Sequence, residues 1–96
     1  MGMDLRQDIQ AAIIALAQEY GLEQVILFGS RARGDNWERS DIDLAVRGGD
    51  VIRFSLDLDD RVPTLLLFDV VDLGGAVDPD LLVSIQREGR KLYEKS

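Results

Sequence analysis

The sequence predicts a small α/β domain in which helices flank a mixed β-sheet. Three observations lead to this fold class. Segments whose apolar residues recur at helical spacing alternate along the chain with short apolar segments of strand-forming residues. The length of 96 residues gives room for one hydrophobic core, so residues 1–96 are expected to form a single domain. The composition, with 46% hydrophobic and 30% charged residues, is typical of a globular protein.

The first third of the chain predicts one helix and one strand. An apolar stripe with spacings of three and four residues predicts a helix over residues 4–20, with Asp4 as its N-cap and Gly21 as its stop. Residues 24–28 are a short apolar run of strand formers, and Gly29 ends it.

A polar loop over residues 30–40 separates this strand from the rest of the domain. Pro63 ends the helix that follows the second strand, and Asp78-Pro79 supplies the N-cap and first residue of the last helix. The segment over residues 65–73 is the most hydrophobic of the predicted strands. The elements expected after the loop are strand, helix, strand, helix and short edge strand, at residues 41–46, 50–61, 65–73, 78–89 and 90–94.

Two residue types are missing from the sequence, and their absence excludes several kinds of functional site. The chain has no Cys and no His, which excludes disulfides, thiolate or His zinc sites, thiol nucleophiles and His-based triads. No apolar run approaches the roughly 18 residues of a membrane span, and the N-terminus has no signal-peptide pattern, so a cytoplasmic protein without membrane contact is expected. The net charge of −7 disfavours direct binding to nucleic acid.

Three aspartates lie inside predicted strands, where aspartate is disfavoured. Asp41 and Asp43 alternate along the second strand and therefore point to one face, and Asp69 reaches the same place if the third strand is its neighbour. Such a cluster stays ionised only beside a cation, and oxygen ligands without His or Cys favour Mg²⁺ or Mn²⁺. Taken alone, an Asp-x-Asp pair is more typical of a turn or an exposed strand end.

The turn after the first strand is a candidate phosphate site. Gly29 and Ser30 offer backbone N–H groups and a hydroxyl in a tight turn, and Arg31 and Arg33 follow within reach of it. Phosphate donors on one loop and carboxylates on a strand pair predict a site for a metal-bound nucleoside triphosphate.

Alternatives stay open at three positions. Asp72 competes as the third carboxylate, although its strand parity is opposite and it lies at the exit of the strand. Arg33 fits a surface ion pair with Asp35 or Glu38 as well as a phosphate contact. Trp37 fits packing on the loop as well as contact with a base or a partner.

The arrangement of Gly29-Ser30, ten residues, then Asp41-x-Asp43 resembles the signature of the DNA polymerase beta nucleotidyltransferase superfamily. The fuller string GSRARGDNWERSDIDLAV resembles its smallest branch, the minimal nucleotidyltransferases (MNT). The likeness extends to the strand LLLFDVVDL and to the tail REGRKLYE, and so over nearly the whole chain. Four fixed residues at this spacing arise by chance on the order of 10⁻³ of the time in a chain of this length.

The resemblance implies the nucleotidyltransferase (polymerase beta-like) fold and a catalytic role for each carboxylate. Asp41 and Asp43 would hold two Mg²⁺ ions, with Mn²⁺ as the alternative. Asp69 would complete the metal site and help to deprotonate the attacking hydroxyl.

It also implies roles for the nucleotide-binding residues, with ATP as the substrate. Gly29 and Ser30 would cradle the β- and γ-phosphates. Either Arg31 or Arg33 would neutralise the charge on the leaving pyrophosphate.

Proteins of this branch are similar to antitoxins of HEPN/MNT toxin–antitoxin systems. The resemblance therefore implies transfer of AMP from ATP to a tyrosine of a cognate HEPN-domain ribonuclease toxin, which neutralises the toxin. Two alternatives remain: an antitoxin that acts only by binding its toxin, and a nucleotidyltransferase that modifies a small molecule, as antibiotic-modifying relatives do. The sequence leaves open whether the chain forms a homodimer or a hetero-oligomer with the toxin.

Overall fold

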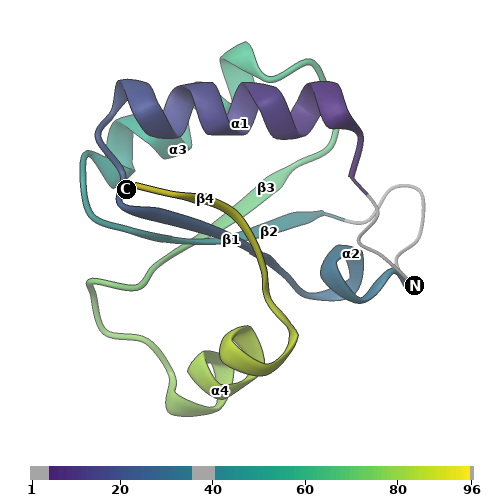
Figure 1. The fold of residues 1–96 in the computed structure, drawn as a ribbon, viewed down its shortest axis with the longest axis vertical. Helices are drawn as coiled ribbons and strands as arrows, with labels where there is room; N and C mark the ends of the chain where they lie inside the picture. Colours follow the sequence, from purple (N-terminus) through teal and green to yellow (C-terminus); the bar gives the residue numbers. More distant parts are fainter. Residues whose placement is uncertain (1–4, 36–40, 96) are drawn as a thin grey trace.

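The computed structural model describes residues 5–35 and 41–95 of the chain. Over these residues a β-sheet lies between two helices on one face and one helix on the other (Figure 1). The elements in chain order are α1 (Gln7–Glu19), β1 (Gln24–Phe28), α2 (Ser30–Arg33), β2 (Ile42–Arg47), α3 (Val51–Arg61), β3 (Phe68–Asp72), α4 (Pro79–Glu88) and β4 (Arg90–Glu94).

The sheet is mixed, as the sequence predicts, and its strand order is β3-β2-β1-β4. The central strand β1 runs antiparallel to both β2 and β4, whereas β3 runs parallel to β2. A parallel neighbour needs a crossover connection, which α3 provides. Neither of the two described parts of the chain contains a helix with the length and hydropathy of a membrane span.

The main hydrophobic core lies between the sheet and the pair α1 and α3. Ile42, Leu44 and Val46 of β2 are fully buried in this core because alternate residues of a strand share one face. Asp43 and Ala45 have the opposite parity, and Ala45 belongs to a smaller cluster beneath α4. The sheet therefore presents Asp43 on the side of α4.

Aspartate caps begin two of the predicted helices. Asp50 accepts a hydrogen bond of 3.1 Å from the backbone N–H of Arg53 at the start of α3. Asp78 accepts one of 2.8 Å from Asp80, and Pro79 occupies the first turn of α4. The predictions of both helices and of a short edge strand over residues 90–94 are confirmed, and this strand, β4, pairs with β1.

The third strand is shorter than the predicted span of residues 65–73. Its pairing begins at Phe68 because Phe68 lies opposite Ile42, the first residue of β2. The backbone N–H of Ile42 donates to the carbonyl of Leu67 at 2.9 Å, and β2 has no earlier residue that continues the ladder. Leu65 and Leu67 therefore precede the strand, and Leu65 is fully exposed.

Two further boundaries differ from the prediction. Helix α1 begins at Gln7 with Arg6 at its N-cap, and Asp8 supplies a negative charge to its first turn; the predicted cap, Asp4, lies outside the described residues. The segment predicted as a polar loop over residues 30–40 begins with the four-residue helix α2.

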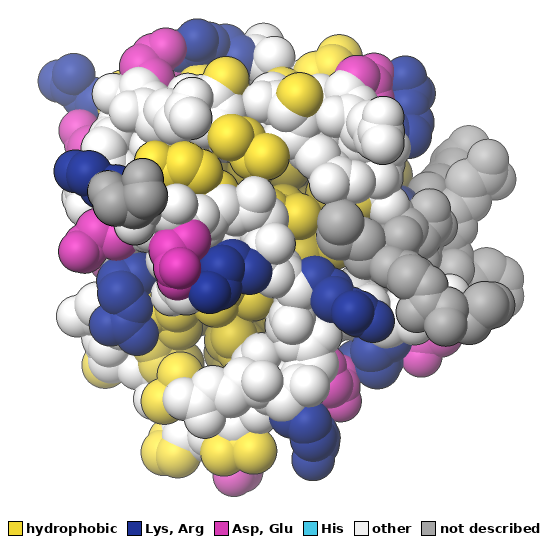
Figure 2. Space-filling view, viewed as in Figure 1, with side chains coloured by type: hydrophobic (Ala, Val, Ile, Leu, Met, Phe, Trp, Pro, Cys, Tyr) yellow, Lys and Arg dark blue, Asp and Glu magenta, His cyan; other side chains and the backbone are white. Residues whose placement is uncertain are grey.

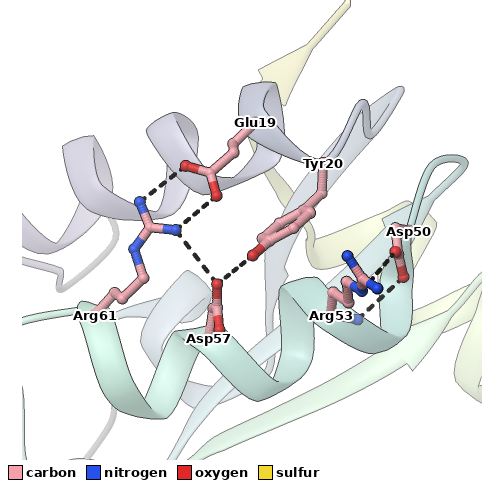
Figure 3. A network of polar contacts seen from close by, with 6 residues as sticks. All are labelled: Glu19, Tyr20, Asp50, Arg53, Asp57 and Arg61. Atoms are coloured by element: carbon pink, nitrogen blue, oxygen red, sulfur yellow. Dashed lines mark hydrogen bonds and ion pairs between the residues drawn. The ribbon is translucent and has the colours of Figure 1, made fainter.

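A polar network joins the end of α1 to α3 (Figure 3). Arg61 donates to both carboxylate oxygens of Glu19, at 2.7 and 2.9 Å, and to Asp57 at 3.3 Å. The hydroxyl of Tyr20 donates to the same Asp57 carboxylate. Both carboxylates lose part of this network when they are protonated.

Acidification is therefore expected to weaken the contact between α1 and α3. Arg61 holds the pKa of Glu19 below its ordinary value of 4.5, and the Tyr20 hydroxyl holds the pKa of Asp57 below 3.8. Because both pKa values are lower in the folded state, the stabilisation is fully present above about pH 5 and is lost as the pH falls through the lowered pKa values. Urea unfolding should show Asp57→Asn less stable than the wild type at about pH 7, with a smaller difference at about pH 3.

The control is Asp59→Asn, which removes an exposed carboxylate from the same helix. It should leave the pH profile of the free energy of unfolding unchanged. An Asp57→Asn variant that differs from the wild type equally at both pH values would contradict the role given to the network.

Candidate active site

Strand pairing brings the candidate carboxylates together at one end of the sheet. Phe28, the last residue of β1, lies opposite Asp43, and Asp43 lies opposite Asp69 of β3. Asp41 lies just before β2 and two residues from Asp43, so strand parity places it on the same face. The condition on which the placement of Asp69 depends, that the third strand is the neighbour of the second, is met. We call Asp41, Asp43 and Asp69 the carboxylate cluster.

The members of the carboxylate cluster differ in burial and influence one another electrostatically. Asp41 and Asp69 are exposed, whereas Asp43 is half-buried. Burial raises the pKa of Asp43, and the negative charges of Asp69 and Asp41 raise it further. The positive charge of Arg33 acts in the opposite direction and lowers it. These four side chains therefore share one electrostatic environment.

The chemistry of the carboxylate cluster fits a divalent cation. It supplies only oxygen donors, which suit Mg²⁺ or Mn²⁺, and a cation would relieve the repulsion that raises the pKa of Asp43. Across residues 5–35 and 41–95, no three acidic side chains converge closely enough to hold one ion. Ligation by all three therefore requires a side chain to turn, and the exposed Asp41 and Asp69 have room to do so.

The two candidates for the third carboxylate lie in different surroundings. Asp69 is in register with Asp43 and contributes to its raised pKa. Asp72 lies opposite Val46, at the far end of β3, and accepts a hydrogen bond of 2.8 Å from the backbone N–H of Gly74. This geometry favours Asp69 and gives Asp72 a role in the turn after β3.

Gly29 connects β1 to α2 in a conformation that suits glycine alone. Its φ of 75° and ψ of −156° lie in a region that side chains do not tolerate. A Cβ atom at this position would lie 2.4 Å from Oδ2 of Asp43. The backbone of the turn is therefore packed directly against the half-buried carboxylate. A glycine is needed here both for the backbone angles and for this close approach.

The side chains predicted to bind phosphate all lie on α2, in different surroundings. Ser30 begins the helix and is partly exposed, whereas the Arg31 side chain is buried, with 5% of the residue exposed. Arg33 ends the helix and donates to Asp35 at 3.2 Å and to Glu88 at 2.7 Å.

The ion pair between Arg33 and Asp35 was one of the alternatives in the sequence. The other predicted partner, Glu38, lies outside the described residues, and so does Trp37. No local sequence pattern predicts the contact between Glu88 and Arg33, because the two residues are 55 positions apart. Only the packing of α4 near α2 brings the two together.

A pocket lies beside the carboxylate cluster, and no pattern in the sequence predicts it. It is lined by Asp41 and by the residues Leu65–Leu67, which precede β3. The sequence predicts that these leucines begin the third strand. Leu65 and Leu67 are instead exposed on the surface next to Asp41, whereas Leu66 is partly buried against the main core.

The charged side chains do not form one basic patch on the face shown in Figure 2. Lys and Arg side chains alternate there with Asp and Glu side chains. A protein that binds nucleic acid through its phosphates concentrates positive charge on one surface.

Comparison with known proteins places these residues in a family. The family model described as "Polymerase beta, Nucleotidyltransferase" matches residues 11–96. That range contains the turn at Gly29, the whole carboxylate cluster and Arg33. No curated protein matches the sequence.

Three solved structures resemble the chain. A toxin–antitoxin structure with AMP-PNP is 26% identical with a TM-score of 0.74, over 90% of this chain and 73% of that one. A mutant of the toxin–antitoxin MntA-HpeT is 26% identical with a TM-score of 0.72, over 96% of this chain and 75% of that one. A structure described as that of a minimal nucleotidyltransferase is 28% identical with a TM-score of 0.67, over 91% of this chain and 98% of that one.

Proposed function

Because the chain belongs to the polymerase beta nucleotidyltransferase family, we propose that it is a Mg²⁺-dependent protein adenylyltransferase that acts as an antitoxin. Its substrate is ATP, and its acceptor is a tyrosine hydroxyl of a cognate HEPN-domain toxin. Transfer of AMP to that tyrosine neutralises the toxin.

The observation that supports this proposal best is the fit between the turn and the strand pair. Gly29 lies against the Asp43 carboxylate, and Asp69 lies next to Asp43 in register. A turn able to hold phosphate is thus joined directly to carboxylates able to hold a divalent cation. A nucleoside triphosphate bound to such a cation needs both. The family signature alone does not show this proximity.

The proposed step is displacement at the α-phosphorus of ATP. The acceptor oxygen forms a bond to that phosphorus, the bond from the α-phosphorus to the bridging oxygen breaks, and pyrophosphate leaves. Asp69 takes the proton of the attacking hydroxyl. Asp41 and Asp43 would hold the divalent cation, and Asp69 would complete that site. When bound, the cation supplies charge neutralisation for the phosphate oxygens. Arg33, which is more exposed than Arg31, neutralises charge on the leaving pyrophosphate.

The choice of a toxin as the acceptor has two supports. Structures that resemble the chain are toxin–antitoxin structures, and one of them contains AMP-PNP. The pocket formed by Asp41 and Leu65–Leu67 opens beside the carboxylate cluster, where an acceptor side chain has to arrive. Its leucines suit contact with an aromatic ring.

Labelled ATP tests the proposal. The purified chain is incubated with Mg²⁺, a co-encoded HEPN-domain toxin and either α-labelled or γ-labelled ATP. We expect label on the toxin from α-labelled ATP only, an increase in toxin mass by one or more AMP groups, and loss of toxin activity. Tight binding that silences the toxin without transfer of label would favour an antitoxin that acts by binding alone.

The identity of the third carboxylate is tested in the same assay. Asp69→Asn should lower the rate of transfer about a hundredfold or more, because it removes both a ligand and the proposed base. Asp72→Asn is the matched control and should remain within about threefold of the wild type, since Asp72 contacts the turn at Gly74 and not the cluster. A large loss in Asp72→Asn with near-normal transfer in Asp69→Asn would reverse the assignment.

A further inference from the structure

An ion pair links α4 to the candidate active site. Oε2 of Glu88, the last residue of α4, accepts a hydrogen bond of 2.7 Å from Nη1 of Arg33, the last residue of α2. The Arg33 side chain is 45% exposed and that of Glu88 is 25% exposed. Glu88 therefore contacts, from another helix, the guanidinium whose positive charge acts on Asp43 of the carboxylate cluster.

The position of Glu88 is fixed by the packing of the residue after it. A Cβ atom on Gly89 would lie 2.5 Å from Cγ2 of Ile26 and 2.4 Å from the carbonyl oxygen of Ile85. The end of α4 therefore rests directly on β1, the strand that leads into Gly29 and α2. The end of α4 that carries Glu88 and the turn of the candidate site are thus both attached to β1.

The Arg33 side chain needs such a contact to hold its guanidinium in a single orientation. An arginine side chain has many rotamers, and its planar guanidinium recognises phosphate best when its orientation is fixed. The other partner of Arg33 among the described residues is Asp35, which follows it by two positions in the sequence. Nε of Arg33 lies 3.2 Å from Oδ2 of Asp35, and the Asp35 side chain is 62% exposed. A contact of that kind is local and screened by solvent, whereas Glu88 is less exposed and comes from a separate helix.

We propose that Glu88 is a positioning residue: it holds the Arg33 guanidinium beside the carboxylate cluster in the orientation that receives the triphosphate of a nucleotide. The inference rests on the proposed function, because it takes a nucleoside triphosphate as the ligand. Glu88 touches neither the ligand nor the reacting atoms and acts only through Arg33. An ion pair this exposed contributes little to the stability of the fold, so its main effect is expected in ligand binding.

A double-mutant cycle on ligand binding tests this role. The dissociation constant of AMP-PNP with Mg²⁺ is measured for the wild type, Glu88→Gln, Arg33→Gln and the double variant, without any acceptor protein. We expect Glu88→Gln to weaken binding about fivefold and Arg33→Gln about tenfold or more. The double variant should bind no more weakly than Arg33→Gln, because Glu88 has no effect once Arg33 is absent.

Asp35→Asn is the control, since it removes the other ion pair of Arg33, and it should bind within about twofold of the wild type. Urea unfolding of each variant should give a midpoint close to that of the wild type, which separates positioning from a structural role. The proposal is overturned if Glu88→Gln binds as tightly as the wild type or more tightly, or if the two losses simply add. Failure of AMP transfer to a toxin, with these binding effects intact, would refute the proposed function alone.

Discussion

Asp43→Asn is expected to lower AMP transfer about a thousandfold, a loss of about 4 kcal/mol of transition-state stabilisation. Asp43 lies at the centre of the carboxylate cluster, between Phe28 and Asp69 in the sheet and against Gly29. An amide of the same shape keeps this packing but carries no negative charge for a cation. The loss should therefore appear in the rate of transfer and in Mg²⁺ dependence, not in folding.

Unfolding of the metal-free protein distinguishes this loss from damage to the fold. Burial and the charges of Asp69 and Asp41 raise the pKa of Asp43, so its ionised form destabilises the folded state at neutral pH. Asp43→Asn should consequently be at least as stable as the wild type. Asp60→Asn, which changes an exposed carboxylate on α3, is the charge-matched control and should transfer AMP normally. Normal transfer by Asp43→Asn would exclude the carboxylate cluster as the metal site.

Gly29→Ala is expected to lower transfer about a hundredfold and to destabilise the fold by about 2–3 kcal/mol. The added methyl group would lie 2.4 Å from Oδ2 of Asp43. The alanine would also have to adopt backbone angles that residues with a side chain avoid. Relief of the clash has to move either the turn or the carboxylate. Both changes separate the turn proposed to hold phosphate from the carboxylates proposed to hold the cation.

Gly21→Ala is the matched control for the cost of a positive φ. Gly21 has a φ of 67°, close to the value of Gly29, but a Cβ atom there would meet nothing within 4 Å. Its replacement should destabilise the fold by about 1–2 kcal/mol and leave the rate of transfer unchanged. If both variants lose stability equally and both keep full activity, the contact between Gly29 and Asp43 has no role in the reaction.

Local chemistry made much of the fold predictable. The cap at Asp78 is a contact between neighbours in the sequence, so the helix that it begins could be predicted directly from the chain. The start of β3 could not be read in this way. Leu65 and Leu67 have the composition of a strand, yet pairing begins only where Ile42 provides a partner. A strand boundary depends on the neighbouring strand as well as on its own residues.

The candidate site shows the same division between local and distant signals. The parity of Asp41 and Asp43, together with the choice of Asp69 over Asp72, follows from the period of a strand and agrees with the register of β2 and β3. The partner of Arg33 does not follow from any local pattern. Glu88 reaches it only through the packing of α4 on the sheet, which depends on contacts across the whole chain.

The strand order also governs the sequence of events during folding. β4 pairs with β1 although Gln24 and its partner Glu94 are 70 residues apart, whereas β1 and β2 are close along the chain. Closing the larger loop costs about 1.4 kcal/mol more conformational entropy than closing the loop between Phe28 and Asp43. The topology therefore favours early assembly of β1, β2 and the Gly29 turn, with β4 docking last. On the ribosome, the Gly29 turn and the Asp43 carboxylate can meet before β4 has been synthesised.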